Sequence, residues 1–286
     1  MLEFRPRLWA SLGLVAALGA GVTACSGEGG AGAGEAAVPA AAAAVPGAAA
    51  PSAGEAAAGE SGGEGGGESG AGEAGASAAY AAIPEAARDA LRVAQLTGFF
   101  AIARKVADAG DPAAAAILVD QGLLEVAQAF PQPFACCAGA ELTAAYQALS
   151  AAWTAGKPAA ETAPLVARAE ALGAEAIGKA GGAPQDVVRG LLQIASGLYA
   201  LVITPDGVDP IEYQHAQGAA LAAKTVFDAA RPTLAAADPG RTADAATRLE
   251  ALLALFPSAT VPETPAPVAE VAASVSRAEL ALSGIR

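Results

Sequence analysis

Residues 186–201 read DVVRGLLQIASGLYAL, and their aliphatic side chains recur at helical spacing. Val187, Leu191, Ile194, Leu198 and Leu201 are separated by 4, 3, 4 and 3 residues, which places them on one stripe of a helix. The alternation typical of strands is missing from the chain. The fold class predicted is therefore all-α. The same helical spacing occurs in three further sets: Ala116, Val119, Leu123, Val126 and Phe130; Leu249, Leu252, Leu253 and Phe256; and Val268, Val271, Val275, Ala278 and Leu282.

Glycine and proline clusters divide this helical region into segments. Examples are Gly110-Asp111-Pro112, Gly156-Lys157-Pro158 and Asp238-Pro239-Gly240. Short connections between long amphipathic helices favour antiparallel neighbours, so we expect an up-and-down bundle or two stacked bundles. About eight helices are predicted, near residues 84–109, 112–130, 140–155, 162–179, 185–204, 210–230, 242–256 and 268–283.

Two hairpins in this region share a sequence of marks, which predicts two related halves. Each hairpin has Asp-Pro after a turn, then Gln-Gly, then a closing Phe. The marks are Asp111-Pro112, Gln121-Gly122 and Phe130 in residues 96–130, and Asp209-Pro210, Gln217-Gly218 and Phe227 in residues 191–227. The spacing between the marks differs by two residues.

The N-terminal residues have the composition of an export signal. Arg5 and Arg7 form a positive start, and the apolar stretch of residues 8–22 follows. This stretch is shorter than the roughly 20 apolar residues of a spanning helix.

The run Val22-Thr23-Ala24-Cys25 resembles the lipobox of bacterial lipoproteins, in which the cysteine is acylated and the chain is cleaved before it. The resemblance implies that signal peptide 1–24 is removed and that lipid on Cys25 anchors the protein to a membrane of the cell envelope. A non-acidic residue after the cysteine, here Ser26, implies the outer membrane, facing the periplasm, where the organism has one. The alternative is an ordinary secretory signal.

Residues 25–79 are predicted to be a disordered tether between the lipid and the helical domain, residues 80–286. Gly, Ala, Ser and Glu dominate this segment, which cannot bury enough apolar surface to offset the entropy of ordering. The domain itself carries 14 basic and 21 acidic residues, in a chain of net charge −13. An acidic surface argues against nucleic acid as a partner.

The densest polar cluster of the domain is Asp209-Pro210-Ile211-Glu212-Tyr213-Gln214-His215. Asp209 fits a helix N-cap and Pro210 the first helical position, while Glu212 falls where its carboxylate can reach back to the amide of the cap. Capping explains these residues without a ligand. The competing interpretation is a ligand-binding pocket formed by Glu212, Tyr213 and His215.

Glu212 and His215 form a Glu-x-x-His pair similar to half of the metal motif of ferritin-like di-iron bundles. A weaker resemblance is to the imelysins, helical envelope proteins linked to iron, whose motif is Gly-x-His-x-x-Glu. Gln217 and Gly218 follow His215 here, so the order of the motif differs and no metal role is carried over. His215 is the single histidine, which also argues against zinc sites and His-dependent triads. We expect no cofactor beyond the lipid, and a bound metal lacks support from the ligand count.

Cys136 and Cys137 are adjacent. With Cys25 acylated, they could form a vicinal disulfide, remain two buried thiols, or bridge to another protein. Adjacent Cα atoms lie about 3.8 Å apart, below the usual disulfide range, so the vicinal bond would be strained.

Two function classes remain. The first is a non-catalytic lipoprotein whose helical domain acts as a binding or scaffold module for an envelope protein or the cell wall. The second is an extracytoplasmic protein that binds a small ligand or a metal cation beside Glu212, Tyr213 and His215. We predict that the protein is not an enzyme, because few side chains suit acid-base or nucleophilic catalysis.

Overall fold

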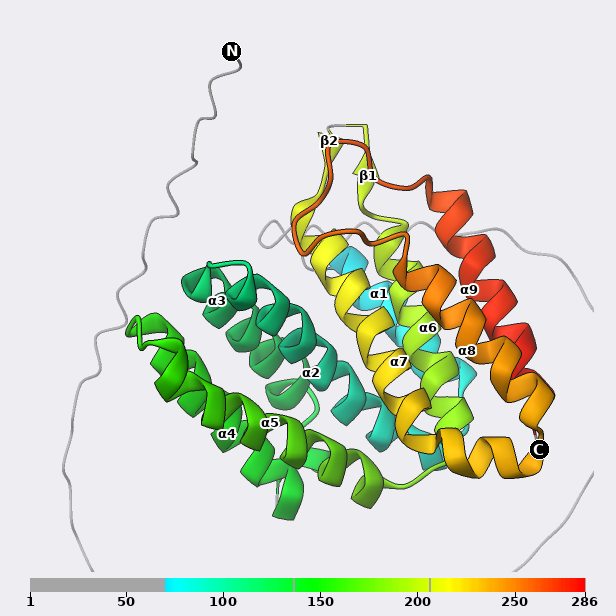
Figure 1. Ribbon diagram of the computed structural model, residues 1–286, viewed down its shortest axis with the longest axis horizontal. Coiled ribbons are helices and arrows are strands. Elements are labelled where there is room, and N and C mark those ends of the chain that lie inside the picture. Colours follow the sequence, from blue (N-terminus) through cyan, green and yellow to red (C-terminus); the bar gives the residue numbers. More distant parts are fainter. Residues whose placement is uncertain (1–69, 136, 206, 286) are drawn as a thin grey trace, which may run out of the picture. The chain divides into compact units, whose positions relative to one another are not determined.

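A computed structural model describes residues 70–135, 137–205 and 207–285. These residues are almost entirely helical (Figure 1), so the predicted all-α class is confirmed. The helices are α1 (Gly70–Ala82), α2 (Glu85–Asp108), α3 (Pro112–Gly122), α4 (Cys137–Thr154), α5 (Ala159–Ala180), α6 (Pro184–Tyr199), α7 (Pro210–Ala237), α8 (Pro239–Leu253) and α9 (Val268–Ser283). One π-helical turn, η1 (Leu123–Gln128), continues α3, and a short 3-10 turn, η2 (Gln132–Phe134), precedes α4.

The first four-helix bundle comprises α2, α3, α4 and α5. Each of these helices contacts the next, and α5 returns to pack on α2. Their apolar faces share one core, in which Leu96, Leu142 and Leu149 are fully buried. Consecutive helices joined by short turns thus form the up-and-down arrangement expected from the sequence.

The second four-helix bundle comprises α6, α7, α8 and α9, again with each helix beside the next and α9 beside α6. Val187, Leu191, Ile194 and Leu198, the stripe that predicted the fold, lie in its core. Helix α9 has the predicted bounds of 268–283.

The two bundles meet where α2 packs against α6 and α7 (Figure 1). The closest approach is at Gly98 of α2 and Gly218 of α7, where a Cβ built on Gly98 would lie 2.8 Å from the carbonyl oxygen of Gly218. The helices have the same order of neighbours in both bundles, whereas the relation between the two halves stays a prediction. The Asp-Pro mark is less specific, because Asp238-Pro239 also caps a helix, α8.

Helix α1 lies against α6 and extends to the N-terminal side of residue 80. Ala79 is already buried. The expected tether of residues 25–79 therefore ends in a helix over its last ten residues, because the small side chains near residue 79 allow packing against α6. The remainder of the tether, Cys25 and the signal peptide lie outside the described residues.

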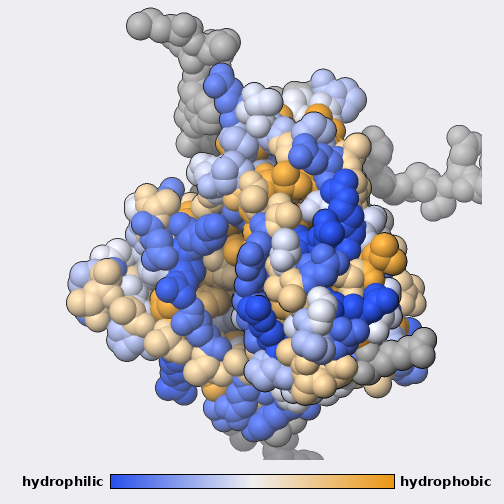
Figure 2. Space-filling model, turned by 45° about the vertical axis from the view of Figure 1, so that its right-hand side comes forward, coloured by the Kyte–Doolittle hydropathy of each residue, from blue (hydrophilic) through white to orange (hydrophobic). Residues whose placement is uncertain are grey.

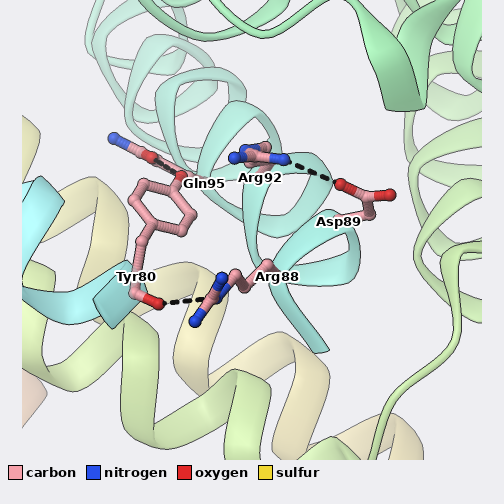
Figure 3. A network of polar contacts seen from close by, with 5 residues as sticks. All are labelled: Tyr80, Arg88, Asp89, Arg92 and Gln95. Atoms are coloured by element: carbon pink, nitrogen blue, oxygen red, sulfur yellow. Dashed lines mark hydrogen bonds and ion pairs between the residues drawn. The ribbon is translucent and has the colours of Figure 1, made fainter. Parts of the chain in front are cut away.

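Polar contacts fasten α1 to α2 (Figure 3). The Arg88 side chain donates to the carbonyl oxygen of Tyr80 at 3.0 Å, and the Tyr80 hydroxyl donates to Gln95. The guanidinium of Arg92 lies over the rings of Tyr80 and Phe130, 5.5 and 4.7 Å from their centroids. Arg92 thereby joins α1 to the segment that follows η1.

Helix α6 ends at Tyr199, five residues before the predicted end at 204. A small antiparallel hairpin follows, with β1 (Ile203–Thr204) paired to β2 (Gly207–Val208). The sequence favoured helix here because the aliphatic stripe continues to Leu201. The chain leaves the helix before this point, and the carbonyl of Val202 accepts a hydrogen bond from the amide of Asp209 at 2.8 Å.

Among the described residues, no helix combines the length and the apolar character that crossing a bilayer would require.

Candidate functional site

The polar cluster lies at the N-terminus of α7, on the side where the second bundle meets the first. Asp209 caps the helix as predicted: its carboxylate accepts from the amides of Ile211 and Glu212 at 2.8 and 3.2 Å. Pro210 occupies the first turn. The local sequence therefore fixes where α7 begins.

Glu212 does not take the second role that the capping pattern suggested. The amide of Asp209, to which its carboxylate was expected to reach back, already donates to the carbonyl of Val202. Instead, Glu212 Oε2 is buried with no hydrogen-bond partner among the described residues. The pKa of Glu212 is raised to about 7. Desolvation is the main cause, and the nearby carboxylates of Asp209 and Glu125 contribute in the same direction.

His215 is buried against the first bundle. Its ring lies 4.7 Å from that of Phe99 on α2, and its Nε2 lies 3.4 Å from Oε1 of Gln121 on α3. Burial lowers the pKa of His215 to about 4, although the charge of Asp209 acts in the opposite direction. The imidazole is therefore neutral at pH 7 and serves as a contact between the bundles.

Tyr213 points into the second bundle and is fully buried. Its ring packs near those of Tyr199 and Phe256, and its hydroxyl donates to the carbonyl of Ser258 at 3.3 Å. Two nearby side chains make similar hydrogen bonds: the side-chain amide of Gln214 donates to the carbonyl of Ala259, and that of Gln217 donates to the carbonyl of Phe256. These side chains hold the long connection between α8 and α9.

The structure thus divides the three proposed ligand-binding residues between two environments. Glu212 and His215 face α3 and η1 of the first bundle, whereas Tyr213 belongs to the core of the second. Among the described residues, no three or more His, Cys, Asp and Glu side chains come together as a metal-binding group.

Sequence reasoning missed Gln121 and Glu125, which approach the cluster from α3 and η1. In the sequence, Gln121 stands out only as part of Gln121-Gly122, the pair that recurs as Gln217-Gly218. The π-helical turn that carries Glu125 has no signal in the hydrophobic spacing, which continues regularly through it. Turns of this kind occur frequently at functional sites.

The structure does not describe the geometry of the other two proposed sites, the lipidation site and the cysteine pair. Cys25 and Cys136 lie outside the described residues, and Cys137 is described only as the first residue of α4. Acylation at Cys25 and the state of the thiol pair therefore stay predictions.

Fold and cluster together define a helical protein of two joined four-helix bundles. Residues 185–285 match the family of iron permease-associated 4-helix bundle domains. This segment coincides with α6–α9 and covers about a third of the chain, so the likeness concerns the second bundle. This match gives no support to the weaker resemblance to the imelysins. No curated protein and no solved structure matches the chain.

Proposed function

We propose that this protein is a non-catalytic binding module of the bacterial cell envelope, anchored by lipid on Cys25, that serves an iron permease. The second bundle contacts the permease or a protein bound to it, and the tether gives the bundles reach from the membrane. In an organism with an outer membrane, the anchor lies there and the bundles face the periplasm.

One observation carries this proposal. The match to iron permease-associated domains begins and ends within two residues of the second bundle's own limits, so the similarity covers all four helices of that bundle. The first bundle then holds this unit through α2. The paucity of catalytic side chains in the sequence suits a binding module.

Crosslinking in intact cells of the native organism tests the proposal. A photo-reactive amino acid replaces Leu280 of α9, whose side chain is 72 % exposed on the second bundle. The matched control places it at Ala171, an exposed position of α5 in the first bundle. We expect the Leu280 position to capture an iron permease subunit and the Ala171 position to capture none.

Uptake of radioactive iron gives an independent readout. Deletion of the gene should lower uptake under iron limitation, and the full chain should restore it while Cys25→Ser should not. Normal uptake in the deletion strain, together with crosslinks to unrelated proteins, would contradict the proposal.

A second candidate function is binding of a metal cation beside Glu212, in the pocket first proposed for Glu212, Tyr213 and His215. The supporting observation is a buried carboxylate oxygen without a partner, close to a second carboxylate, Glu125. A cation there would offset both the desolvation and the repulsion.

Calorimetric titration of the full chain with Fe²⁺ under anaerobic conditions tests this candidate. Binding should be lost in Glu212→Gln and kept in Glu250→Gln, a variant of an exposed carboxylate on α8. Equal binding by the two variants would reject a site at Glu212.

A further inference from the structure

A cavity of about 670 Å³ lies between the two bundles, away from the His215 cluster. Helix α2 forms its floor, α5 and α7 form its walls, and the turn between α5 and α6 lines one end. Figure 2 shows hydrophobic side chains in a recess between ridges of hydrophilic ones on this side of the molecule. Pockets for small molecules typically have volumes of about 300–1,000 Å³.

The cavity exists because the side chains on its walls are small. Helix α5 contributes Ala169, Gly173 and Ala174, and α7 contributes Ala222, Ala229 and Ala230. Both walls pack on α2, and the larger lining side chains, Ile177 of α5 and Leu221 and Val226 of α7, leave the space between these small residues open. Alanine and glycine bring α2 and α7 together at Gly98 and Gly218 and leave a mainly apolar opening beside that contact.

A buried hydroxyl without a partner lies in the wall. Tyr146 of α4 lines the cavity and is 1 % exposed, and its hydroxyl forms no hydrogen bond with the described residues. Its ring is held by stacking on Phe100, with centroids 5.1 Å apart. A Cβ built on Gly173, which also lines the cavity, would lie 3.8 Å from the hydroxyl oxygen. Leaving such a donor unsatisfied is costly, and a ligand with an acceptor atom would satisfy it.

Two cations, Arg104 and Lys105, and two carboxylates, Asp108 and Glu170, also line the cavity. Arg104 follows Phe100 by one helical turn and pairs with Glu170, which precedes Gly173 by one turn. Arg104 is thereby balanced, and Asp108 lies within its reach at 3.7 Å. The neighbouring Lys105, also in the lining, makes no ion pair with the part of the chain that the structure describes. Lys105 is therefore the one cation in the lining that no described carboxylate pairs, and it is the group that an anionic head would approach.

We propose that the cavity between α2, α5 and α7 binds an amphiphile with an elongated apolar body and a carboxylate or ester head. The body lies between the alanine-rich walls. The head accepts a hydrogen bond from Tyr146 and lies near Lys105. The ligand is either a free long-chain acid or an acyl chain of the protein's own lipid, because the two share this chemistry. This site is independent of the iron-permease proposal.

Calorimetry with dodecanoate, below its micelle concentration, tests the site. The protein is the full chain with Cys25→Ser, so that no acyl group of its own competes. We expect saturable binding of one dodecanoate, and weaker binding of dodecanol, which lacks the charge. Absence of saturable binding would overturn the proposal. A chain acylated on Cys25 that excludes dodecanoate, while Cys25→Ser binds it, identifies the protein's own lipid as the occupant; equal binding identifies a free acid.

Three variants separate binding from folding. Ala174→Trp fills the cavity from an exposed wall position and should weaken binding at least tenfold, whereas Ala171→Trp, exposed on the same helix outside the cavity, should leave it unchanged. Tyr146→Phe should weaken binding of dodecanoate about tenfold. Because the hydroxyl has no partner in the empty protein, the same variant should keep or raise the midpoint of thermal unfolding. Unchanged affinity in both Ala174→Trp and Tyr146→Phe would overturn the proposal.

Discussion

Replacing Gly98 by alanine tests how the two bundles are joined. The new Cβ would lie 2.8 Å from the carbonyl oxygen of Gly218, 3.0 Å from its carbonyl carbon and 3.3 Å from the amide nitrogen of Ala219. All three are backbone atoms, so no side chain can rotate away. To reach ordinary van der Waals contact, α2 and α7 would have to separate by about 0.6 Å along this line.

Two opposing effects set the magnitude. Alanine stabilises a helix interior by about 1 kcal/mol relative to glycine. Overpacking of a buried contact costs about 1–3 kcal/mol. Gly178→Ala isolates the first effect, because Gly178 is an exposed residue of α5 and a Cβ there would meet nothing within 4 Å. The free energy of unfolding should therefore be about 1–3 kcal/mol lower in Gly98→Ala than in Gly178→Ala.

Urea denaturation of the full chain, followed by circular dichroism, measures this difference. Gly178→Ala should raise the midpoint above that of the unchanged chain, and Gly98→Ala should lower it relative to Gly178→Ala with an unchanged slope. Gly218→Ala should act like Gly98→Ala, since its Cβ would lie 2.6 Å from the carbonyl oxygen of Gly98. Equal midpoints for Gly98→Ala and Gly178→Ala would refute the close approach of α2 and α7.

The polar cluster and the cysteines support four further predictions. Because the pKa of Glu212 is raised from 4.5 to about 7 in the fold, its contribution to stability falls as pH rises through that interval; Glu212→Gln should therefore raise the urea midpoint more at pH 8 than at pH 5. Because the pKa of His215 is lowered from 6.5 to about 4, its contribution is lost as pH falls from 6.5 towards 4, and the midpoint of His215→Gln should fall less than that of the unchanged chain over this range. In cells fed a radiolabelled fatty acid, Cys25→Ser should abolish labelling and release the protein from the membrane fraction. Thiol titration should find Cys136 and Cys137 free with and without reductant, and no titratable thiol before reduction would establish a disulfide instead.

Local sequence was sufficient for the helices and their starts. Asp111, Asp209 and Asp238 each accept a hydrogen bond from an amide in the first turn of the helix that follows, and a proline occupies its first position. These interactions join residues two or three apart, so a short stretch contains all the information they need. The aliphatic stripe of α6 is predictive for the same reason, since its spacing matches the helical period.

The candidate site could be predicted only in part. Sequence singled out Glu212 and His215, but their environment depends on Phe99, Gln121 and Glu125, which are distant along the chain. The burial that shifts both pKa values arises only where the two bundles meet. The capping role assigned to the Glu212 carboxylate was wrong because a contact outside the helix, from Val202, already satisfies the amide it would have reached.

The all-α class and the limits of most helices follow from the sequence without the structure. The lipoprotein-like N-terminus stays a prediction. Tertiary structure alone decided that eight of the helices form two bundles around α2, that Tyr213 and His215 face different cores, and that small residues on α5 and α7 border a cavity. The difference lies in the sequence separation over which each interaction acts. Helix periodicity and capping act within a few residues, whereas burial, the unsatisfied hydroxyl of Tyr146 and the contact of Gly98 with Gly218 depend on segments brought together by packing.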